Sequence, residues 1–328
     1  MKMYRQIAVL GGGAWGTALA AMATNLGHHV TLYARDEKTV EDINNNRRNN
    51  RYLPDIALPD TVKATADLQQ ALKTADTVLI VIPAQALAAV LASLTPFISA
   101  KTPLVLCSKG IDQTSSRFMS DIAEDIFPHH PIAILSGPGF AADVAKGLPT
   151  AVTIAAGNDS LAHNLAHMLS GQTFRCYAST DLKGVEIGGA LKNVLALAAG
   201  IATGYGLGAS AQAAIITRSF AELRRIGMAF GGKQETMTGL SVLGDLILTC
   251  SSPQSRNYAY GMVLGAGKST DGLLLAEGVA TAPVAAGLCD KHGIDAPVIH
   301  TVAAILAGRL SVADAVRMLI NRPLKFED

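Results

Sequence analysis

The 328-residue sequence has few cysteines, and their spacing argues against both a disulfide framework and a zinc site. Its four cysteines are scattered, and no two of them form a C-x-x-C pair. This pattern fits reduced thiols in a cytoplasmic protein. His163 and His167 have the spacing of a metal-binding pair, but neither an H-E-x-x-H motif nor a third ligand accompanies them. We therefore expect no metal.

The sequence also lacks an excess of charge of either sign. Lysine and arginine total 27 against 26 aspartates and glutamates, so the formal net charge is +1. This balance argues against a broad surface that binds a nucleic acid, while a small basic site for one phosphate remains compatible with it. Only 16% of the residues are charged and 49% are hydrophobic. A chain of this length and composition suggests about two domains with sizeable cores.

The apolar stretches are interrupted in ways that argue against a signal peptide and a membrane span. Residues 11–13 are all glycine and break the N-terminal apolar stretch where a signal helix would be continuous. The most hydrophobic later stretch, residues 187–216, carries Lys192, Asn193 and several glycines. We expect a cytoplasmic protein without a membrane span.

The first half of the chain alternates short apolar runs with helical patterns. Almost continuous apolar runs are typical of strands that are buried on both faces of a parallel sheet. The predicted strands span residues 7–10, 30–33, 78–82, 104–106 and 132–135, with further candidates at 152–154 and 173–177. A helix predicted between the first two of them, residues 14–26, is closed by Gly27. This alternation predicts a Rossmann-like, doubly wound α/β domain over residues 1–178.

Helical patterns dominate the second half. The predicted helices span residues 182–202, 209–226, 241–248, 253–264 and 297–306. Few β-branched runs interrupt them. We therefore predict that residues 179–328 form a mostly α-helical domain that carries the substrate site.

A glycine-rich segment predicts a dinucleotide-binding loop. The segment from Gly11 to Gly16 matches G-x-G-x-x-G, follows a predicted strand and opens a predicted helix. In that context Gly11 permits the tight turn, Gly13 lets the backbone approach a pyrophosphate, and Gly16 lets helix and strand pack closely. The free N–H groups and the positive end of the helix dipole then face the anion. The expected cofactor is NADP or NAD.

The end of the second predicted strand bears on the choice of cofactor. A carboxylate at this position binds the ribose 2′-hydroxyl of NAD, whereas an arginine accommodates the 2′-phosphate of NADP. Arg35 and Asp36 stand there side by side. We expect Arg35 to face the adenosine, and we predict a preference for NADPH or the use of both cofactors.

Lys192 lies in an apolar segment that predicts a buried helix. Burial of an ammonium group is costly unless it is paired, and burial lowers its pKa into a range that suits proton exchange near neutral pH. The segment alone leaves open that the side chain reaches the surface along its aliphatic stem. Asp245 and Thr249 lie four residues apart, on one face of a predicted helix, where the carboxylate could pair with a buried lysine.

Further segments suit an anionic substrate. Residues 252–253, Ser and Pro, predict the N-cap and first residue of a helix, which places residues 255–257 in its first turn, where anions are favoured. Arg256 supplies the planar fork that binds phosphate well. The loops at 108–110 and 136–140 follow predicted strands at their carboxyl ends, where α/β sheets bind ligands.

These segments together resemble the bacterial glycerol-3-phosphate dehydrogenase family, nearly from end to end. The matching motifs are residues 11–16 (GGGAWG), 49–54 (NNRYLP), 108–111 (SKGI), 136–138 (SGP), 188–199 (GGALKNVLALAA), 243–250 (LGDLILTC), 255–257 (SRN) and 277–278 (EG). The resemblance implies an oxidoreductase that uses NAD(P)H to interconvert dihydroxyacetone phosphate and sn-glycerol 3-phosphate, a precursor of glycerophospholipids. It also implies a homodimer.

The motifs and the resemblance together predict roles for individual residues. Lys192 would be the catalytic proton donor or acceptor at the substrate oxygen. The expected substrate-binding residues are Lys109, Gly137, Gly139, Lys192, Asp245, Thr249, Ser255, Arg256 and Asn257. The expected cofactor-binding residues are Gly11, Gly13, Ala14, Trp15, Gly16, Arg35, Lys109, Ala141, Arg256, Leu275 and Glu277.

The sequence departs from the family pattern at Gly139. The family usually has threonine there, with a hydroxyl that contacts the substrate, so a backbone group or a water molecule must replace it here. Leu275 also stands in place of a more usual valine. Two alternative functions remain open: a hydroxyacyl-CoA or hydroxyacid dehydrogenase of similar two-domain plan, and a non-catalytic NADPH-binding sensor.

Overall fold

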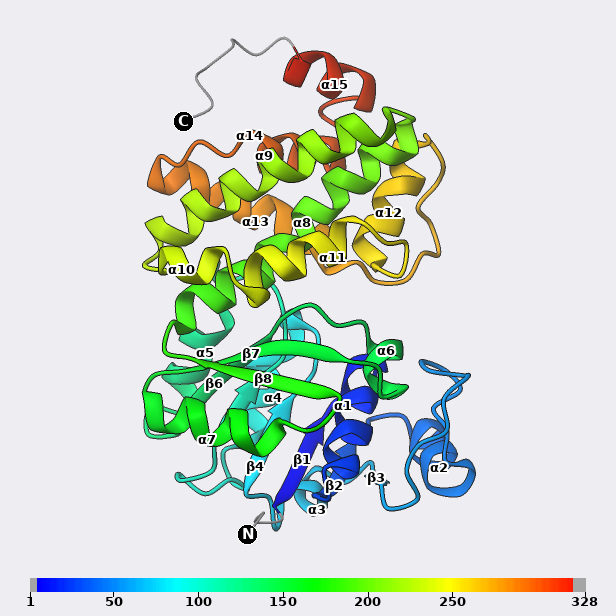
Figure 1. Cartoon of the computed structure of the whole chain (residues 1–328), viewed down its shortest axis with the longest axis vertical. Helices are drawn as coiled ribbons and strands as arrows, with labels where there is room; N and C mark the ends of the chain where they lie inside the picture. The colour runs from blue at the N-terminus through cyan, green and yellow to red at the C-terminus, as the bar shows by residue number, and fades with distance from the viewer. Residues whose placement is uncertain (1–4, 321–328) are drawn as a thin grey trace.

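The computed structural model describes residues 5–320, which fold into a half built on a sheet and a helical half (Figure 1). The outer ends of the two predicted domains, residues 1–4 and 321–328, lie outside this range. The last strand ends at Ser179, and every later element in the described range is a helix. The predicted fold class, a Rossmann-like α/β half followed by a helical half, is confirmed.

The sheet contains eight strands in the order β3-β2-β1-β4-β5-β6-β7-β8. They are β1 (Gln6–Leu10), β2 (His29–Tyr33), β3 (Lys63–Thr65), β4 (Thr77–Ile80), β5 (Leu104–Leu106), β6 (Ile132–Ser136), β7 (Thr150–Ala156) and β8 (Phe174–Ser179). All neighbours are parallel except β6 and β7. The chain turns back after β6 instead of crossing over the sheet, so β7 runs antiparallel to β6.

Helices cover both faces of the sheet. They are α1 (Ala14–Asn25), α2 (Glu37–Asn46), α3 (Leu68–Leu72), η1 (Ala84–Ala86), α4 (Leu87–Leu94), α5 (Met119–Ile126), α6 (Ala141–Ala145) and α7 (Asp159–Leu169). Side chains of α1, α6 and α7 share one hydrophobic cluster with the sheet, and those of α3, α4 and α5 share another. The central strands are therefore buried on both sides, as their continuous apolar runs predict.

The helical half is arranged around one central helix, α8. Its helices are α8 (Leu182–Tyr205), α9 (Gly208–Ala229), α10 (Gln234–Met237), η2 (Leu240–Gly244), α11 (Asp245–Cys250), α12 (Arg256–Gly265), α13 (Glu277–His292), α14 (Pro297–Leu306) and α15 (Val312–Ile320). α8 is long and apolar enough to cross a bilayer, but 94% of its most apolar window is buried inside the fold. Its apolar surface on all sides is that of a core helix.

The start of α12 differs from the prediction. The helix begins at Arg256, and Ser255 rather than Ser252 is its N-cap: the Ser255 Oγ accepts a hydrogen bond from the Tyr258 N–H at 3.3 Å. Ser252 and Pro253 instead belong to the preceding turn, in which the Ser252 carbonyl accepts from the Ser255 N–H at 3.0 Å. Arg256 therefore occupies the first helical position.

Other differences have local causes. The helix predicted over residues 241–248 begins as the π-helix η2 and continues as α11. The sequence pattern does not predict β3, which is only three residues long, or α13, which contains Pro283 and many small residues that weaken its hydrophobic period.

Candidate active site

The loop between β1 and α1 fits a bound dinucleotide. Gly11 has a φ of +130°, and a Cβ atom there would lie 2.1 Å from the Val81 carbonyl oxygen. A Cβ atom at Gly16 would lie 1.9 Å from the Gly11 carbonyl oxygen, so only glycine permits this packing. Nothing lies within 4 Å of the Cβ position of Gly13, which leaves room for a pyrophosphate. Gly11 thus permits the tight turn, Gly16 permits the close packing of helix and strand, and Gly13 leaves the backbone open to a pyrophosphate.

Further predicted cofactor residues lie at or just before helix starts, in both halves of the chain. Ala14 and Trp15 begin α1, and Ala141 begins α6, which packs against α1. Arg35 is exposed in the loop after β2. Leu275 is exposed just before α13, and Glu277 is the first residue of that helix.

A cluster of two amines and one carboxylate lies where the two halves meet. Lys192 of α8 is only 7% exposed, and its Nζ lies 2.5 Å from Asp245 Oδ1. The same Nζ donates to Thr249 Oγ1 at 2.9 Å. Lys109, in the loop after β5, donates to the other carboxylate oxygen, Asp245 Oδ2, at 2.7 Å. The structure thus brings together Lys109, Lys192, Asp245 and Thr249, from both halves of the chain.

Burial and charge set the protonation behaviour of this cluster. Burial lowers the pKa of Lys192 to about 8, and the neighbouring ammonium of Lys109 adds to the effect, while Asp245 opposes it. Burial alone would raise the pKa of Asp245, but Lys109 and Lys192 outweigh it and hold that pKa below its usual range. Burial also raises the pKa of Glu277, against the opposing effect of Arg256 and both lysines. A lysine whose pKa lies near neutrality is suited to donate and accept a proton.

A chain of side-chain amides lies beside the cluster and fixes the start of α12. Asn257 donates from Nδ2 to Asn193 Oδ1 at 3.0 Å, and its Oδ1 accepts from the Gly278 N–H at 2.8 Å. The Asn257 side chain is therefore held between α8 and α13, while the adjacent Arg256 is exposed. Asn193 is not among the predicted site residues, although it follows Lys192 directly in the sequence and contacts the predicted residue Asn257.

The loop after β6 lies beside the glycine loop. A Cβ atom at Gly137, whose φ is +152°, would lie 2.7 Å from Val152 Cα. At Gly139 a Cβ atom would lie 3.3 Å from both Trp15 Cη2 and Thr150 Cγ2. The threonine of the family pattern would require these neighbours to shift by a few tenths of an ångström. Glycine, which has no Cβ atom, fits this close packing without such a shift.

Two buried polar atoms near this loop have no hydrogen-bond partner among the described residues: Trp15 Nε1 and Ser136 Oγ. Ser136 Oγ would lie 3.0 Å from a Cβ atom at Gly189, and the Lys109 side chain lies against the same glycine. Orphaned polar atoms are uncommon in folded proteins, and at this position they fit a site that a ligand or water completes.

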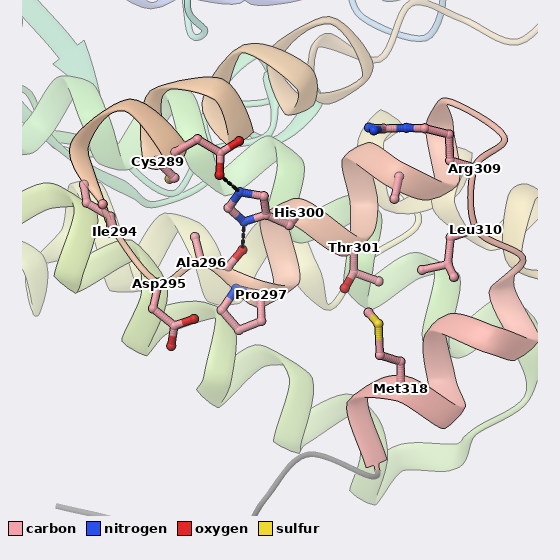
Figure 2. A pocket seen from close by; sticks show the side chains of 13 residues that line it. Cys289, Ile294, Asp295, Ala296, Pro297, His300, Thr301, Arg309, Leu310 and Met318 are labelled. Atoms are coloured by element: carbon pink, nitrogen blue, oxygen red, sulfur yellow. Dashed lines mark hydrogen bonds and ion pairs between the residues drawn. The ribbon is translucent and has the colours of Figure 1, made fainter.

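A cavity of about 710 Å³ lies elsewhere, between α13, α14 and α15 (Figure 2). None of the predicted site residues lines it. His300 Nε2 lies 2.9 Å from Asp290 Oδ1, and its Nδ1 lies 2.7 Å from the Ala296 carbonyl oxygen. Dashed lines mark both contacts of His300 in Figure 2. Neither the two lysines nor the glycine loop lines this cavity. We therefore place the candidate active site at the junction of the two halves instead.

Metal-binding geometry is absent from residues 5–320: no group of three or more histidine, cysteine, aspartate or glutamate side chains is placed to hold an ion. His163 lies on the exposed side of α7, beside Asp159.

Comparison with known proteins identifies relatives of the whole chain. Residues 6–162 match the model of the NAD-dependent glycerol-3-phosphate dehydrogenase N-terminus, and residues 181–317 match that of the C-terminus. The chain is 60% identical to glycerol-3-phosphate dehydrogenase [NAD(P)+] of Brucella canis, over 99% of this chain and 100% of the relative. It is 57% identical to the enzyme of that name from Mesorhizobium japonicum, over 98% and 94%. A glycerol-3-phosphate dehydrogenase structure from Coxiella burnetii is 40% identical, with a TM-score of 0.93 over 97% of this chain and 99% of that one.

Proposed function

The chain belongs to the NAD-dependent glycerol-3-phosphate dehydrogenase family, and we propose that Lys192 is the proton donor when it reduces dihydroxyacetone phosphate. The enzyme is an oxidoreductase that transfers a hydride between NAD(P)H and this substrate and forms sn-glycerol 3-phosphate. The observation that carries the proposal is the buried Lys192 ammonium, held by Asp245 at the junction of the two halves.

The bound cofactor supplies the hydride, and the protein supplies the proton and the charge. Lys192 donates its proton to the C2 oxygen as negative charge develops there, and it accepts a proton in the reverse direction. Asp245 holds Lys192 in place, and Lys109 completes the pair of ammonium groups around the carboxylate. Two ammonium groups against one carboxylate leave a positive charge that favours an anionic substrate.

The substrate phosphate would be bound at the start of α12. Arg256 occupies the first helical position, where the free N–H groups of the first turn favour an anion. Its exposed guanidinium is available for two parallel hydrogen bonds to phosphate oxygens. Binding energy at the phosphate would orient the reacting carbon toward Lys192.

We also propose that the enzyme prefers NADPH or uses both cofactors. Asp36, the carboxylate that would bind the ribose of NAD, is already engaged as the N-cap of α2: it accepts from the Lys38 N–H at 3.3 Å and from Thr39 Oγ1 at 2.9 Å. It also pairs with Arg51 at 3.2 Å. Arg35 is exposed beside it and available to a 2′-phosphate.

The choice of cofactor can be tested through Arg35. The substitution Arg35→Ala should raise the KM for NADPH by about tenfold and leave that for NADH nearly unchanged, since it removes one charged partner of the 2′-phosphate. Steady-state kinetics with each cofactor measure both values. If the wild-type enzyme binds NADH at least about tenfold more tightly than NADPH, the proposed preference is wrong.

A homodimer in the cytoplasm, supplying glycerol 3-phosphate for glycerophospholipid synthesis, completes the proposal. The family resemblance supports all three parts, and the four free cysteines support the cytoplasmic location. Light scattering coupled to size-exclusion chromatography would measure the mass in solution. A mass near twice the 34.0 kDa of one chain is expected, and a mass of one chain would contradict the dimer.

The reaction itself is tested by mixing the protein with NADPH or NADH and dihydroxyacetone phosphate and following the absorbance of the reduced nicotinamide. Loss of absorbance with this substrate is expected. Loss only with the keto form of a hydroxyacyl-CoA or a hydroxyacid would favour the alternative dehydrogenase. Binding of NADPH without turnover of any of them would favour the sensor.

A further inference from the structure

The motif at residues 49–54 has no role in the mechanism so far, yet its first residue contacts the dinucleotide loop. Asn49 follows α2 and is only 1% exposed. Its Nδ2 donates to the Gly12 carbonyl oxygen at 2.9 Å and to Thr17 Oγ1 at 2.7 Å. Thr17 is fully buried in the first turns of α1. One side chain thus connects the glycine loop with the helix that the loop opens.

These two hydrogen bonds constrain the atoms that would face a pyrophosphate. Because a peptide bond is planar and trans, the Gly13 N–H points away from the Gly12 carbonyl, and fixing the carbonyl fixes the direction of that N–H. Gly13 is the N-cap of α1, and its carbonyl accepts from the Thr17 N–H at 2.9 Å. Glycines are conformationally permissive, so the run from Gly11 to Gly13 needs an external constraint to keep one shape.

The main chain of Asn49 organises a second part of the same region. Its carbonyl oxygen accepts from the Tyr52 N–H at 3.1 Å and from the Leu53 N–H at 2.8 Å, which closes a turn. Arg51 lies in this turn and contacts Asp36, the N-cap of α2. Asn49 therefore links the glycine loop to the segment beside the expected 2′-phosphate.

We propose that Asn49 is a positioning residue for the cofactor: it holds the glycine loop in the shape that binds the pyrophosphate. This proposal rests on the proposed binding of NADPH at that loop. Asn49 lies outside the amine cluster, so it contributes to cofactor affinity and has no part in proton transfer.

The test compares Asn49→Ala with a matched control, Asn44→Ala. Asn44 also makes two hydrogen bonds: its Nδ2 donates to the Ala64 carbonyl oxygen and its Oδ1 accepts from the Ala64 N–H, both at 2.9 Å. These bonds join α2 to β3, and within the described residues Asn44 makes no hydrogen bond to the glycine loop. Fluorescence titration measures the Kd for NADPH of each protein without turnover. Asn49→Ala should raise this Kd about tenfold, whereas Asn44→Ala should leave it within about twofold.

Kinetics separate positioning from general damage to the fold. With saturating NADPH, the kcat of Asn49→Ala and its pH profile should remain those of the wild-type enzyme, because Lys192 is untouched. Equal increases in Kd for both variants, or a lowered kcat with an unchanged Kd, would overturn the proposal. Failure of the wild-type protein to bind NADPH would instead refute the proposed function.

A second variant covers the case in which Asn49→Ala does not fold. Thr17→Val has nearly the same shape as the native side chain but removes one of the two acceptors. It should raise the Kd for NADPH by a smaller factor, about threefold, with kcat unchanged. An unchanged Kd in a folded Thr17→Val protein would contradict the role of the hydrogen bond between Asn49 and Thr17.

Discussion

At the scale of single residues, the proposed chemistry depends on one carboxylate that pairs with two amines. Asp245 contacts Lys192 with one oxygen and Lys109 with the other. An isolated ammonium at the position of Lys192 would be costly, and the carboxylate offsets much of that cost while it fixes the amine in place. The same arrangement keeps the lysine near its point of titration.

The pH dependence of activity should follow from this arrangement. Reduction requires the protonated amine, so kcat/KM for dihydroxyacetone phosphate should fall as the pH rises through about 8, the pKa of Lys192. Oxidation of glycerol 3-phosphate requires the neutral amine and should become faster over the same range. Initial rates measured in both directions test this, and parallel profiles in the two directions would contradict it.

Removing the carboxylate should move that titration. In Asp245→Asn the two ammonium groups lose their shared partner and repel each other, so the pKa of Lys192 should fall. The midpoint of the reduction profile should therefore shift to lower pH, and kcat should decrease because the amine is no longer held. Thr249→Val, which keeps the carboxylate, is the matched control. A midpoint that stays in place in Asp245→Asn would be evidence against the coupling.

Local sequence patterns anticipate part of this site. The apolar segment around Lys192 predicts a buried helix but leaves the position of the amine open, and the structure buries it. The spacing of Asp245 and Thr249 predicts their shared face, which the hydrogen bond between them at 3.3 Å confirms. The pairing of Asn257 with Asn193 is beyond such patterns, because it joins residues 64 positions apart through helix packing. The binding roles of the individual residues stay predictions.

At the scale of elements, helix starts depend on contacts that local patterns do not contain. Ser252 and Ser255 are both acceptable N-caps, and Pro253 suits a first helical position. The start at Arg256 coincides with the anchoring of Asn257 to α8 and α13. The existence of α12 was therefore predictable, and its first residue was not.

The buried carboxyl group of Glu222 caps the start of α14 and should make the stability of the protein depend on pH. Glu222 of α9 accepts from the Val298 N–H at 2.8 and 3.0 Å and from the Ile299 N–H at 3.3 Å, which caps α14. Burial raises its pKa from 4.5 to about 7. A raised pKa means that its contribution to stability is full below pH 4.5 and is lost as the pH rises through about 7.

The substitution Glu222→Gln keeps an acceptor oxygen and removes this titration. The free energy of unfolding of the wild-type protein should decrease relative to that of the variant between about pH 5 and about pH 8. Chemical denaturation at both pH values measures the difference. Glu41→Gln, at an exposed position of α2, should show no such change. A constant difference for Glu222→Gln would show that the carboxyl titrates normally.

At the scale of the whole molecule, the candidate site combines residues from both halves. Lys109 comes from a loop of the sheet half, and Asp245 comes from the helical half. A second connection lies nearby, where Glu186 of α8 accepts from the Ser120 N–H of α5 at 2.7 Å and Lys183 pairs with Asp121. These contacts fix the orientation of the halves and hence the distance between the glycine loop and Lys192.

The overall architecture was largely predictable because it follows from periodicity. Continuous apolar runs identify the central strands, and the change from these runs to a helical hydrophobic period near residue 181 marks the start of the helical half. The reversal of β7 was not predictable from these runs, because parallel and antiparallel buried strands have the same apolar pattern. The arrangement of Lys109 against Asp245 likewise depends on how the halves pack.

The most direct test of the central claim is a pair of measurements on Lys192→Ala: the rate of dihydroxyacetone phosphate reduction and the Kd for NADPH. We predict that turnover falls by at least about 10²-fold, the lower range for loss of a general acid, while NADPH binding stays within about twofold of the wild-type value. Turnover at the wild-type rate in this variant would contradict the assignment of Lys192 as the proton donor.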